Sequence, residues 1–273
     1  MLIGSVNVHG LGRWRLQDYS RIQTIEHHIA QQTINILALQ ETWLRPADSL
    51  SDITTVFKQQ QRYRFFAAHR PNQDSQAHRG SGGVGLLIET KLWDKCEQVM
   101  MDSVDYECVW VKLVRADIVL HVASVYIPPV SHHRSAAVVR HRLDRLCNDV
   151  MSLSAIAPVI LCGDFNCRVG TLPSKTDTYC YFRQSADTRH TPGPLDRHFA
   201  SSFDACQLLL LNGLFGHTAQ FTNISVGHSC QYGAASSIVD YISVSHSILN
   251  WVDKQLGLHA EHNSSLSPEH AIL

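Results

Sequence analysis

Short apolar runs recur along this chain, and each stops at a polar residue. Runs of this length that are rich in Ile, Leu and Val favour strands buried in a sheet. We therefore predict strands at residues 2–8, 34–39, 86–88, 108–114, 118–126 and 158–162. Weaker patterns predict further strands near residues 208–212, 220–222 and 237–243.

Other segments have the periodicity of amphipathic helices. After Asp18, a candidate N-cap, Ile22, Ile25 and Ile29 fall on one helical face. A helix is also expected from Leu195 to about Ala205. Between residues 136 and 153, apolar residues recur in steps of three and four, at Val139, Leu143, Leu146, Val150 and Leu153.

Two long polar segments, residues 67–80 and 167–194, show little periodicity. Their content of Pro, Arg, Asp and Thr predicts surface loops. Arginines in and around the second segment, such as Arg168 and Arg183, either follow a DNA backbone or belong to an ordinary solvated loop. No repeat or linker interrupts the chain, so the pattern predicts a single α/β domain with mixed strand pairing.

Composition narrows the class of protein. The 273 residues are 44% hydrophobic and 17% charged, which is typical of an ordinary globular protein. A net charge of −1 excludes a uniformly basic coat for nucleic acid, so contact with a polyanion must be local or assisted by a metal. The chain has no apolar stretch near the ~20 residues needed to cross a bilayer, and its first residues lack a signal-peptide pattern.

The eight cysteines form no C-x-x-C pair, and several stand in apolar runs. Reduced, buried thiols explain this pattern better than a disulfide framework or a zinc site. The cysteines therefore predict a reducing intracellular compartment, the cytosol or the nucleus.

Polar clusters stand where four apolar strands stop: at Asn7, at Gln40-Glu41, at Gly163-Asp164-Phe165-Asn166, and at Asp240. Alone, each has an ordinary explanation, because a carboxylate at a strand end is usually solvated or caps a turn. Asp240, however, lies among apolar residues, where a carboxylate must be paired or bound. Four such placements in one domain favour a shared site.

The chemistry that suits this set is hydrolysis of a phosphate ester. One or two carboxylates are typical ligands of Mg²⁺, which also binds substrate phosphate oxygens. Asp164 and Asn166, one residue apart, would face the same side in extended chain. One can then orient an attacking water while the other donates a hydrogen bond to a phosphoryl oxygen, and a histidine can assist.

Five motifs follow one another along almost the whole chain: Val6-Asn7-Val8-His9-Gly10-Leu11, Gln40-Glu41-Thr42-Trp43, Ser124-Val125-Tyr126-Ile127-Pro128-Pro129, Gly163-Asp164-Phe165-Asn166 and Ser237-Ile238-Val239-Asp240-Tyr241-Ile242. Their order resembles the endonuclease/exonuclease/phosphatase superfamily. Three further segments narrow the likeness: Arg79-Gly80-Ser81-Gly82-Gly83-Val84-Gly85, Leu211-Asn212-Gly213 and Gln220-Phe221-Thr222. With them, the sequence is similar to the endonuclease domain of non-LTR (LINE-type) retrotransposons.

The resemblance implies a two-sheet α/β sandwich flanked by helices, of the DNase I-like type. It implies a nuclear DNA endonuclease that uses Mg²⁺, with Mn²⁺ as a substitute, and that nicks target DNA to prime reverse transcription. Glu41 would be the main metal ligand, with Asn7 beside it. Tyr126 would hydrogen-bond near the scissile phosphate, and Asp164 would position the water.

The resemblance assigns three further roles. Asn166 would contact a phosphate oxygen, and Asp240 would hold Asn7 and the metal side of the site. The family ends with Ser-Asp-His, whose His contacts the phosphate, whereas this chain has Ser267-Pro268-Glu269-His270. Glu269 is one methylene longer than Asp, which predicts either weakened orientation of His270 or a decayed copy. The segment 1–273 is predicted to be one endonuclease-like domain with a truncated last strand, from a polyprotein in which a reverse transcriptase would follow.

Several alternatives stay open at this stage. The protein can be another hydrolase of the superfamily, such as an abasic-site nuclease or an inositol-phosphate or sphingomyelin phosphodiesterase. It can be a degenerate domain that binds nucleic acid or protein without cutting, or a metal-binding structural module built on its 17 histidines. Residues 80–85 lack the ending of a Walker motif and are interpreted as a tight turn. Trp43 is interpreted as a packing residue, with base stacking as the functional alternative.

Overall fold

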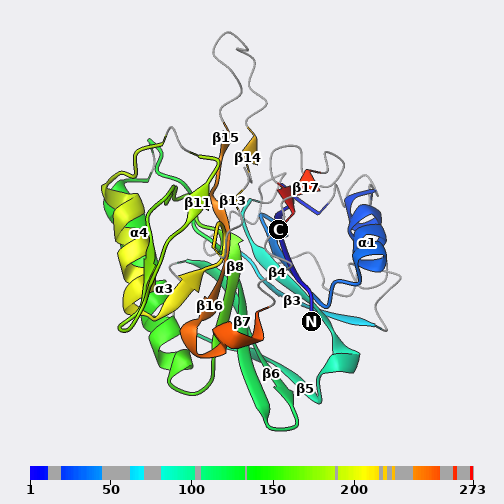
Figure 1. Ribbon diagram of the computed structural model, residues 1–273. Coiled ribbons are helices and arrows are strands. Elements are labelled where there is room, and N and C mark those ends of the chain that lie inside the picture. Colours follow the sequence, from blue (N-terminus) through cyan, green and yellow to red (C-terminus); the bar gives the residue numbers. More distant parts are fainter. Residues whose placement is uncertain are drawn as a thin grey trace.

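Two mixed sheets face each other and lie between helices, as Figure 1 shows. The computed structural model describes residues 1–11, 20–44, 62–70, 81–101, 106–132, 134–187, 190–214, 218–219, 223–224, 236–252, 261–262 and 271–272. The smaller sheet has the order β1 (Ile3–Asn7), β2 (Ile36–Gln40), β4 (Val84–Glu89), β3 (Tyr63–Ala68). The larger has the order β12 (Leu208–Leu210), β16 (Asp240–Ser245), β8 (Val159–Asp164), β7 (Ile118–Tyr126), β6 (Glu107–Arg115), β5 (Lys95–Val99).

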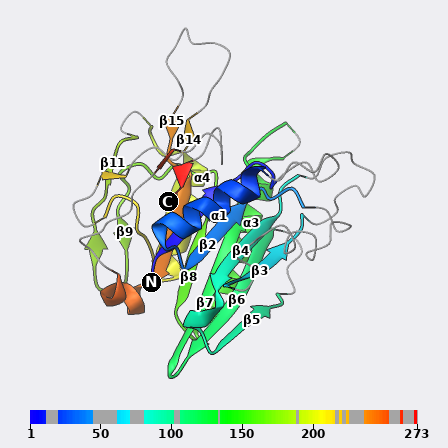
Figure 2. The same cartoon turned by 90° about the vertical axis from the view of Figure 1, so that its right-hand side faces the viewer.

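Helices cover the outer faces of both sheets. Among the described residues, the α-helices are α1 (Ser20–Gln32), α3 (Ala136–Ser154) and α4 (Pro194–Ala205), and the 3₁₀ helices are η2 (Thr90–Leu92) and η4 (His246–Trp251). In Figure 2, α1 lies across the face of the four-stranded sheet. The described residues also form pairs of two-residue strands: β9 (Ser174–Lys175) with β10 (Cys180–Tyr181), β11 (Gln184–Ser185) with β13 (Thr218–Ala219), β14 (Asn223–Ile224) with β15 (Ser236–Ser237), and β17 (Glu261–His262) with β18 (Ala271–Ile272).

Three apolar layers hold the sandwich together. One fills the space between the sheets, with Val111, Val122 and Ile160 among its members. A second lies between the six-stranded sheet and helices α3 and α4, and a third lies under α1. Strands that contact apolar layers on both faces must be apolar throughout, which is why they appear in the sequence as continuous runs. No helix within the described ranges is long and apolar enough to cross a membrane.

The two-sheet α/β sandwich predicted from the resemblance is confirmed, and so are most of its elements. The predicted strand at 118–126 matches β7, and the helix at 136–153 matches α3 to within a residue. Strands β3 and β5 were not predicted, because edge strands are exposed on one side and carry mixed residues. The candidate cap Asp18 and the strand near 220–222 lie outside the described residues.

The prediction of a surface loop at 167–194 is wrong in part. Arg183 is 6% exposed, and its guanidinium donates to Asn212 O at 2.7 Å, to Leu172 O at 3.0 Å and to Leu210 O at 3.1 Å. Burial lowers the pKa of Arg183 to about 10, so it remains charged at neutral pH. A cation that satisfies backbone carbonyls inside the protein supplies hydrogen bonds that regular structure would otherwise have to make. This arginine is therefore not available to DNA.

An aromatic cluster anchors the segment that follows β8. Phe165 is fully buried, with its ring centroid 5.0 Å from Phe199 and 5.4 Å from Phe203 on α4. The two rings on α4 are themselves 4.4 Å apart, and Tyr241 joins from β16. Phe165 stands between Asp164 and Asn166, so the packing of this cluster fixes the backbone that carries both polar residues.

Removal of one ring from this cluster should destabilise the protein strongly. Phe199→Ala is expected to lower the free energy of unfolding by about 3–5 kcal/mol, because it leaves a cavity lined by aromatic rings. The control is Met151→Ala on α3, where the side chain is 56% exposed and the change should stay within about 0.5 kcal/mol. Urea unfolding measures both, and equal effects would contradict the packing described.

Candidate active site

The site begins at the edge of the four-stranded sheet where two parallel strands end together. Asn7 is the last residue of β1, and it pairs in register with Gln40, the last residue of β2. Glu41 follows Gln40 directly. Carboxyl ends of neighbouring parallel strands are a common place for ligand sites, because the sheet holds the side chains that project there. Asn7 and Glu41 are therefore presented from one rigid edge.

Three other predicted residues stand abreast in the six-stranded sheet. Tyr126 on β7 pairs with Asp164 on β8, and Asp240 on β16 pairs with Asp164 from the other side. Residues directly opposite one another on neighbouring strands project to the same face of a sheet. The register of three strands therefore brings Tyr126, Asp164 and Asp240 together.

Asn7 joins the two sheets at this point. Its Nδ2 donates to Glu41 Oε1 at 2.8 Å and to Asp164 Oδ2 at 3.0 Å. Both carboxylates thus lie within hydrogen-bond distance of one amide nitrogen. The amide oxygen of Asn7 accepts from His9 N at 3.2 Å. A role for Asn7 as a metal ligand would require that oxygen to turn toward the carboxylates, so this role stays a prediction.

A second amide bridges the sheets below the site. Gln40 is fully buried, and its Nε2 donates to Ser124 Oγ on β7 at 3.0 Å and to Ser5 Oγ on β1 at 3.2 Å. Ser124 Oγ in turn donates to Leu39 O at 2.8 Å. Buried polar groups that are satisfied by one another fix the relative placement of the elements that carry them. Gln40 and Ser124 therefore keep the edge of one sheet in place over the centre of the other.

Glu41 is held in an unusual backbone conformation. Its φ is 51°, a left-handed value that is uncommon for residues other than glycine and that costs about 1–3 kcal/mol. Hydrogen bonds on both sides offset this strain: Gly10 N donates to Glu41 O at 2.6 Å, and Trp43 N donates to Gly82 O at 2.7 Å. The surrounding loops thus determine where the Glu41 carboxylate points.

A buried carboxylate anchors the glycine turn that supports this segment. Glu107 is 3% exposed and accepts from Gly83 N and, at 2.7 Å, from Arg70 Nε. Gly83 O accepts from Thr42 N at 3.1 Å. At Gly83, φ is +80°, and a Cβ would lie 2.8 Å from Thr42 Oγ1, so only glycine fits. Burial raises the pKa of Glu107, and the Arg70 charge opposes that rise.

The Tyr126 hydroxyl is buried and close enough to Glu41 and Asp164 to be affected by their negative charges. It is 6% exposed, and burial raises its pKa far above the ordinary value of about 10. The charges of Glu41 and Asp164 raise it further. A phenol in this setting stays protonated at neutral pH, so Tyr126 is a hydrogen-bond donor beside two carboxylates.

Asn166 is positioned by a local turn rather than by extended chain. Its φ is 49°, and its backbone N donates to Asp164 Oδ1 at 3.0 Å. Its Nδ2 donates to Ile127 O at 3.0 Å. The expected extended geometry is therefore wrong, because the Asp164 side chain closes a turn on the backbone two residues further on. Asp164 and Asn166 are nevertheless linked by a direct hydrogen bond.

Asp240 is fully buried in β16 beside Asp164. The adjoining backbone is fastened by Asn212, whose Nδ2 donates to Asp240 O at 3.0 Å and whose Oδ1 accepts from Ile242 N at 3.2 Å. A side-chain amide that pairs with a strand in this way fixes its end as another strand would.

The structure thus brings six of the eight predicted site residues together: Asn7, Glu41, Tyr126, Asp164, Asn166 and Asp240. Glu269 and His270 lie outside the described residues. Sequence analysis missed the supporting residues Glu107 and Asn212. A charged residue at the entry to an apolar run was an available signal for Glu107, and Asn212 belongs to a motif to which no role was assigned.

The donor set of the cluster is suited to a hard divalent cation. Glu41 is partly exposed, whereas Asp164 is 1% exposed, and both are carboxylates that share one amide. Two like charges this close repel unless a cation or a donor lies between them. Oxygen ligands that include one or two carboxylates are what Mg²⁺ takes. Within the ranges that the structure describes, no group of three or more His, Cys, Asp and Glu side chains forms a metal cluster of its own.

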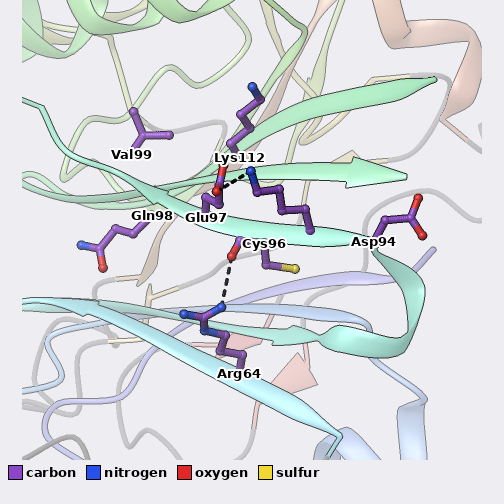
Figure 3. Close-up of a pocket in the computed structure, with 8 residues that line it drawn as sticks. Arg64, Asp94, Cys96, Glu97, Gln98, Val99 and Lys112 are labelled. Atoms are coloured by element: carbon purple, nitrogen blue, oxygen red, sulfur yellow. Dashed lines mark hydrogen bonds and ion pairs between the residues drawn. The ribbon is translucent and has the colours of Figure 1, made fainter. Parts of the chain in front are cut away.

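A cavity of about 740 Å³ lies away from the cluster, between the edge strands of the two sheets (Figure 3). Lys112, Arg64 and Glu97 are among its lining residues. Arg64 donates to Cys96 O at 3.2 Å, and Lys95 pairs with Glu97 at 2.6 Å. The predicted site residues do not line this cavity. Its lining residue Lys112 lies five residues after Glu107 on β6, so the cavity is near the C-terminal end of this strand.

Residues 4–242 match the model of the Endonuclease/Exonuclease/phosphatase family. The chain therefore belongs to this family, and the predicted superfamily is confirmed. No curated protein sequence matches the chain closely enough to be informative.

Solved structures share the fold at low sequence identity. The endonuclease domain of TRAS1, a telomere-specific non-LTR retrotransposon, is 12% identical with a TM-score of 0.64, over 99% of this chain and 94% of that one. A variant of the 3′ phosphatase NExo from Neisseria, bound to a product DNA hairpin, is 14% identical with a TM-score of 0.69, over 99% and 96%. An AP endonuclease from Archaeoglobus fulgidus is 13% identical with a TM-score of 0.66, over 100% and 97%.

The anchor of the glycine turn gives a direct test of this geometry. Glu107→Gln replaces one acceptor oxygen by an NH₂ group that faces donors, and it should lower the free energy of unfolding by about 1–3 kcal/mol. Glu97→Gln makes the same chemical change in an exposed pair with Lys95 and should cost less than about 1 kcal/mol. Urea titration followed by circular dichroism compares the two variants. If Glu107→Gln left the free energy of unfolding unchanged, the turn would be held by other contacts.

Proposed function

We propose that this protein is a Mg²⁺-dependent endonuclease that hydrolyses DNA phosphodiester bonds and nicks one strand to leave a 3′-hydroxyl. The observation that carries the proposal is the contact of Asn7 with the carboxylates of both Glu41 and Asp164. That contact gathers, at one point, the groups that phosphoester hydrolysis needs. Membership of the family supports the reaction class.

Each residue of the cluster has a step that suits its chemistry. Glu41 would hold the metal, with Asn7 and Asp240 on the same side of the site. Bound Mg²⁺ would polarise a phosphoryl oxygen and offset negative charge at the scissile phosphate. Asp164 would orient the attacking water and accept its proton. Tyr126, which stays protonated, would donate a hydrogen bond to the phosphate.

The amide of Asn166, the imidazole of His270 and the carboxylate of Glu269 complete the proposed mechanism. Asn166 would donate to a phosphoryl oxygen from its Nδ2, which has one hydrogen engaged with Ile127 O. His270 would contact the scissile phosphate and stabilise charge that develops in the transition state. Glu269 would orient His270, in place of the aspartate of the family motif.

DNA as substrate is supported by the fold shared with the TRAS1 endonuclease domain, the DNA-bound NExo and the archaeal AP endonuclease. The motifs favour the retrotransposon type among these. In that setting the nick would prime reverse transcription in the nucleus, with a reverse transcriptase on the same polypeptide or acting with it. A net charge of −1 implies modest affinity for DNA that falls steeply with salt.

Loss of either central carboxylate should abolish nicking. Glu41→Gln and Asp164→Asn are each expected to slow Mg²⁺-dependent conversion of supercoiled plasmid to open circles by at least about 100-fold. Asp117→Asn, an exposed position outside the cluster, is the control and should nick like wild type. Equal nicking by wild type and both site variants would overturn the site. Abasic oligonucleotides and small phosphoesters, tested in parallel, separate this function from those of the other superfamily hydrolases.

The substitution at the final motif gives a further test. Glu269→Asp restores the family residue and should raise the nicking rate, by about 10- to 100-fold if orientation of His270 limits turnover. The measurement is the initial rate of plasmid nicking at saturating Mg²⁺. The second candidate function, a domain that binds DNA without cutting, is favoured by Glu269. It predicts that wild type and Glu269→Asp are equally inactive while both still bind DNA.

A further inference from the structure

Trp43 contacts the proposed metal ligand directly. Its indole Nε1 donates to Glu41 Oε2 at 3.1 Å, while Asn7 Nδ2 donates to Glu41 Oε1 at 2.8 Å. Each oxygen of this carboxylate thus has its own donor. The terminal torsion of a glutamate is broad and only weakly restrained by the side chain itself. A donor at each oxygen therefore fixes the plane in which the carboxylate presents its remaining lone pairs.

Trp43 is itself held firmly. Its backbone is left-handed, with φ 53°, and its ring lies over Gly10, where a Cβ would stand 2.3 Å from Cε3. His9 meets the ring edge-on, with centroids 6.0 Å apart and an interplanar angle of 78°. Only glycine at position 10 lets the indole approach this closely. The loop after β1 thus makes room for the ring that supports Glu41.

We propose that Trp43 is a positioning residue for metal binding, acting through its indole N–H on the Glu41 carboxylate. This inference rests on the proposed function, because it takes Glu41 as the metal ligand. Groups that hydrogen-bond to a ligand and fix its orientation raise metal affinity, and their loss typically weakens it about 10- to 100-fold. Packing alone does not require the N–H group, since a benzene ring would also cover Gly10. The hydrogen bond is what distinguishes the two roles.

The first measurement is Mn²⁺ binding without DNA, followed by the electron paramagnetic resonance signal of the free ion. Trp43→Phe keeps an aromatic ring and removes the N–H group, and it should weaken Mn²⁺ binding about 10-fold. The control, Trp251→Phe, changes a tryptophan that is 60% exposed on η4 and should leave the affinity unchanged. In nicking assays, Trp43→Phe should raise the Mg²⁺ concentration for half-maximal rate by the same factor, with a near-normal rate at saturation.

The second measurement uses the indole as its own probe. Mn²⁺ is paramagnetic and quenches a nearby excited indole, so wild-type fluorescence should fall as the site fills. The fall should persist when each of the other four tryptophans is changed, in Trp14→Phe, Trp93→Phe, Trp110→Phe and Trp251→Phe, and it should vanish in Trp43→Phe. These control variants keep Trp43, so this test holds even if Trp43→Phe fails to fold by circular dichroism.

The outcomes separate the inference from the function on which it rests. Equal Mn²⁺ affinity in wild type and folded Trp43→Phe would overturn the role of Trp43 and leave the proposed function standing. Bound Mn²⁺ in wild type without any quenching would place the metal away from Trp43 and would also overturn the inference. Absence of Mn²⁺ binding by wild type would overturn both. Weaker binding in Trp43→Phe together with loss of quenching supports the role.

Discussion

The site depends on the contact between the two sheets beside the ends of β1, β2, β7 and β8, where side-chain amides cross the space that apolar residues fill elsewhere. Gln40 reaches Ser124 below the site, and Asn7 reaches Asp164 within it. Hydrophobic packing between sheets is not directional and would tolerate a small slide of one over the other. Buried amides with satisfied partners do not tolerate it. The hydrogen bonds of Gln40 and Asn7 therefore determine how precisely the side chains of the cluster are placed relative to one another.

Hydrogen bonds that continue beyond the strand ends then place the reactive groups. The loop after β1 hydrogen-bonds to the loop after β2, which in turn hydrogen-bonds to the glycine turn before β4. Glu107 on β6 accepts a hydrogen bond from this turn and holds it in place. Glu41 and Trp43 both adopt left-handed backbone within this arrangement. Strain of this kind persists only where the surroundings determine the conformation. Its presence at the predicted metal ligand agrees with a site that is organised before any ligand arrives.

Much of the fold could be predicted from the sequence, because strands that pack against apolar layers on both faces consist of unbroken apolar runs. Most of the site residues could also be predicted, because Asn7, Tyr126 and Asp164 end such runs and Glu41 follows one. Asp240 differs, because it is the first residue of β16 and not the last residue of a strand. The convergence of the site residues could not be predicted, because it follows from strand register: Asp164 stands between Tyr126 and Asp240 only once β7, β8 and β16 are paired. The burial of Arg183 could not be predicted either, since its partners include three backbone carbonyls, which any sequence supplies.

In the segment Gly163-Asp164-Phe165-Asn166, residues that make polar contacts at the site alternate with a residue that packs in the core. Phe165 points into the aromatic cluster, where Phe199 and Phe203 meet it, while its neighbours contact Asn7 and Ile127. A relative that had lost the proposed nuclease activity would still need the ring in order to fold, but it would no longer need the polar pair for catalysis. Loss of activity would thus be accompanied by substitutions of Asp164 and Asn166, whereas loss of the fold would be accompanied by substitution of Phe165.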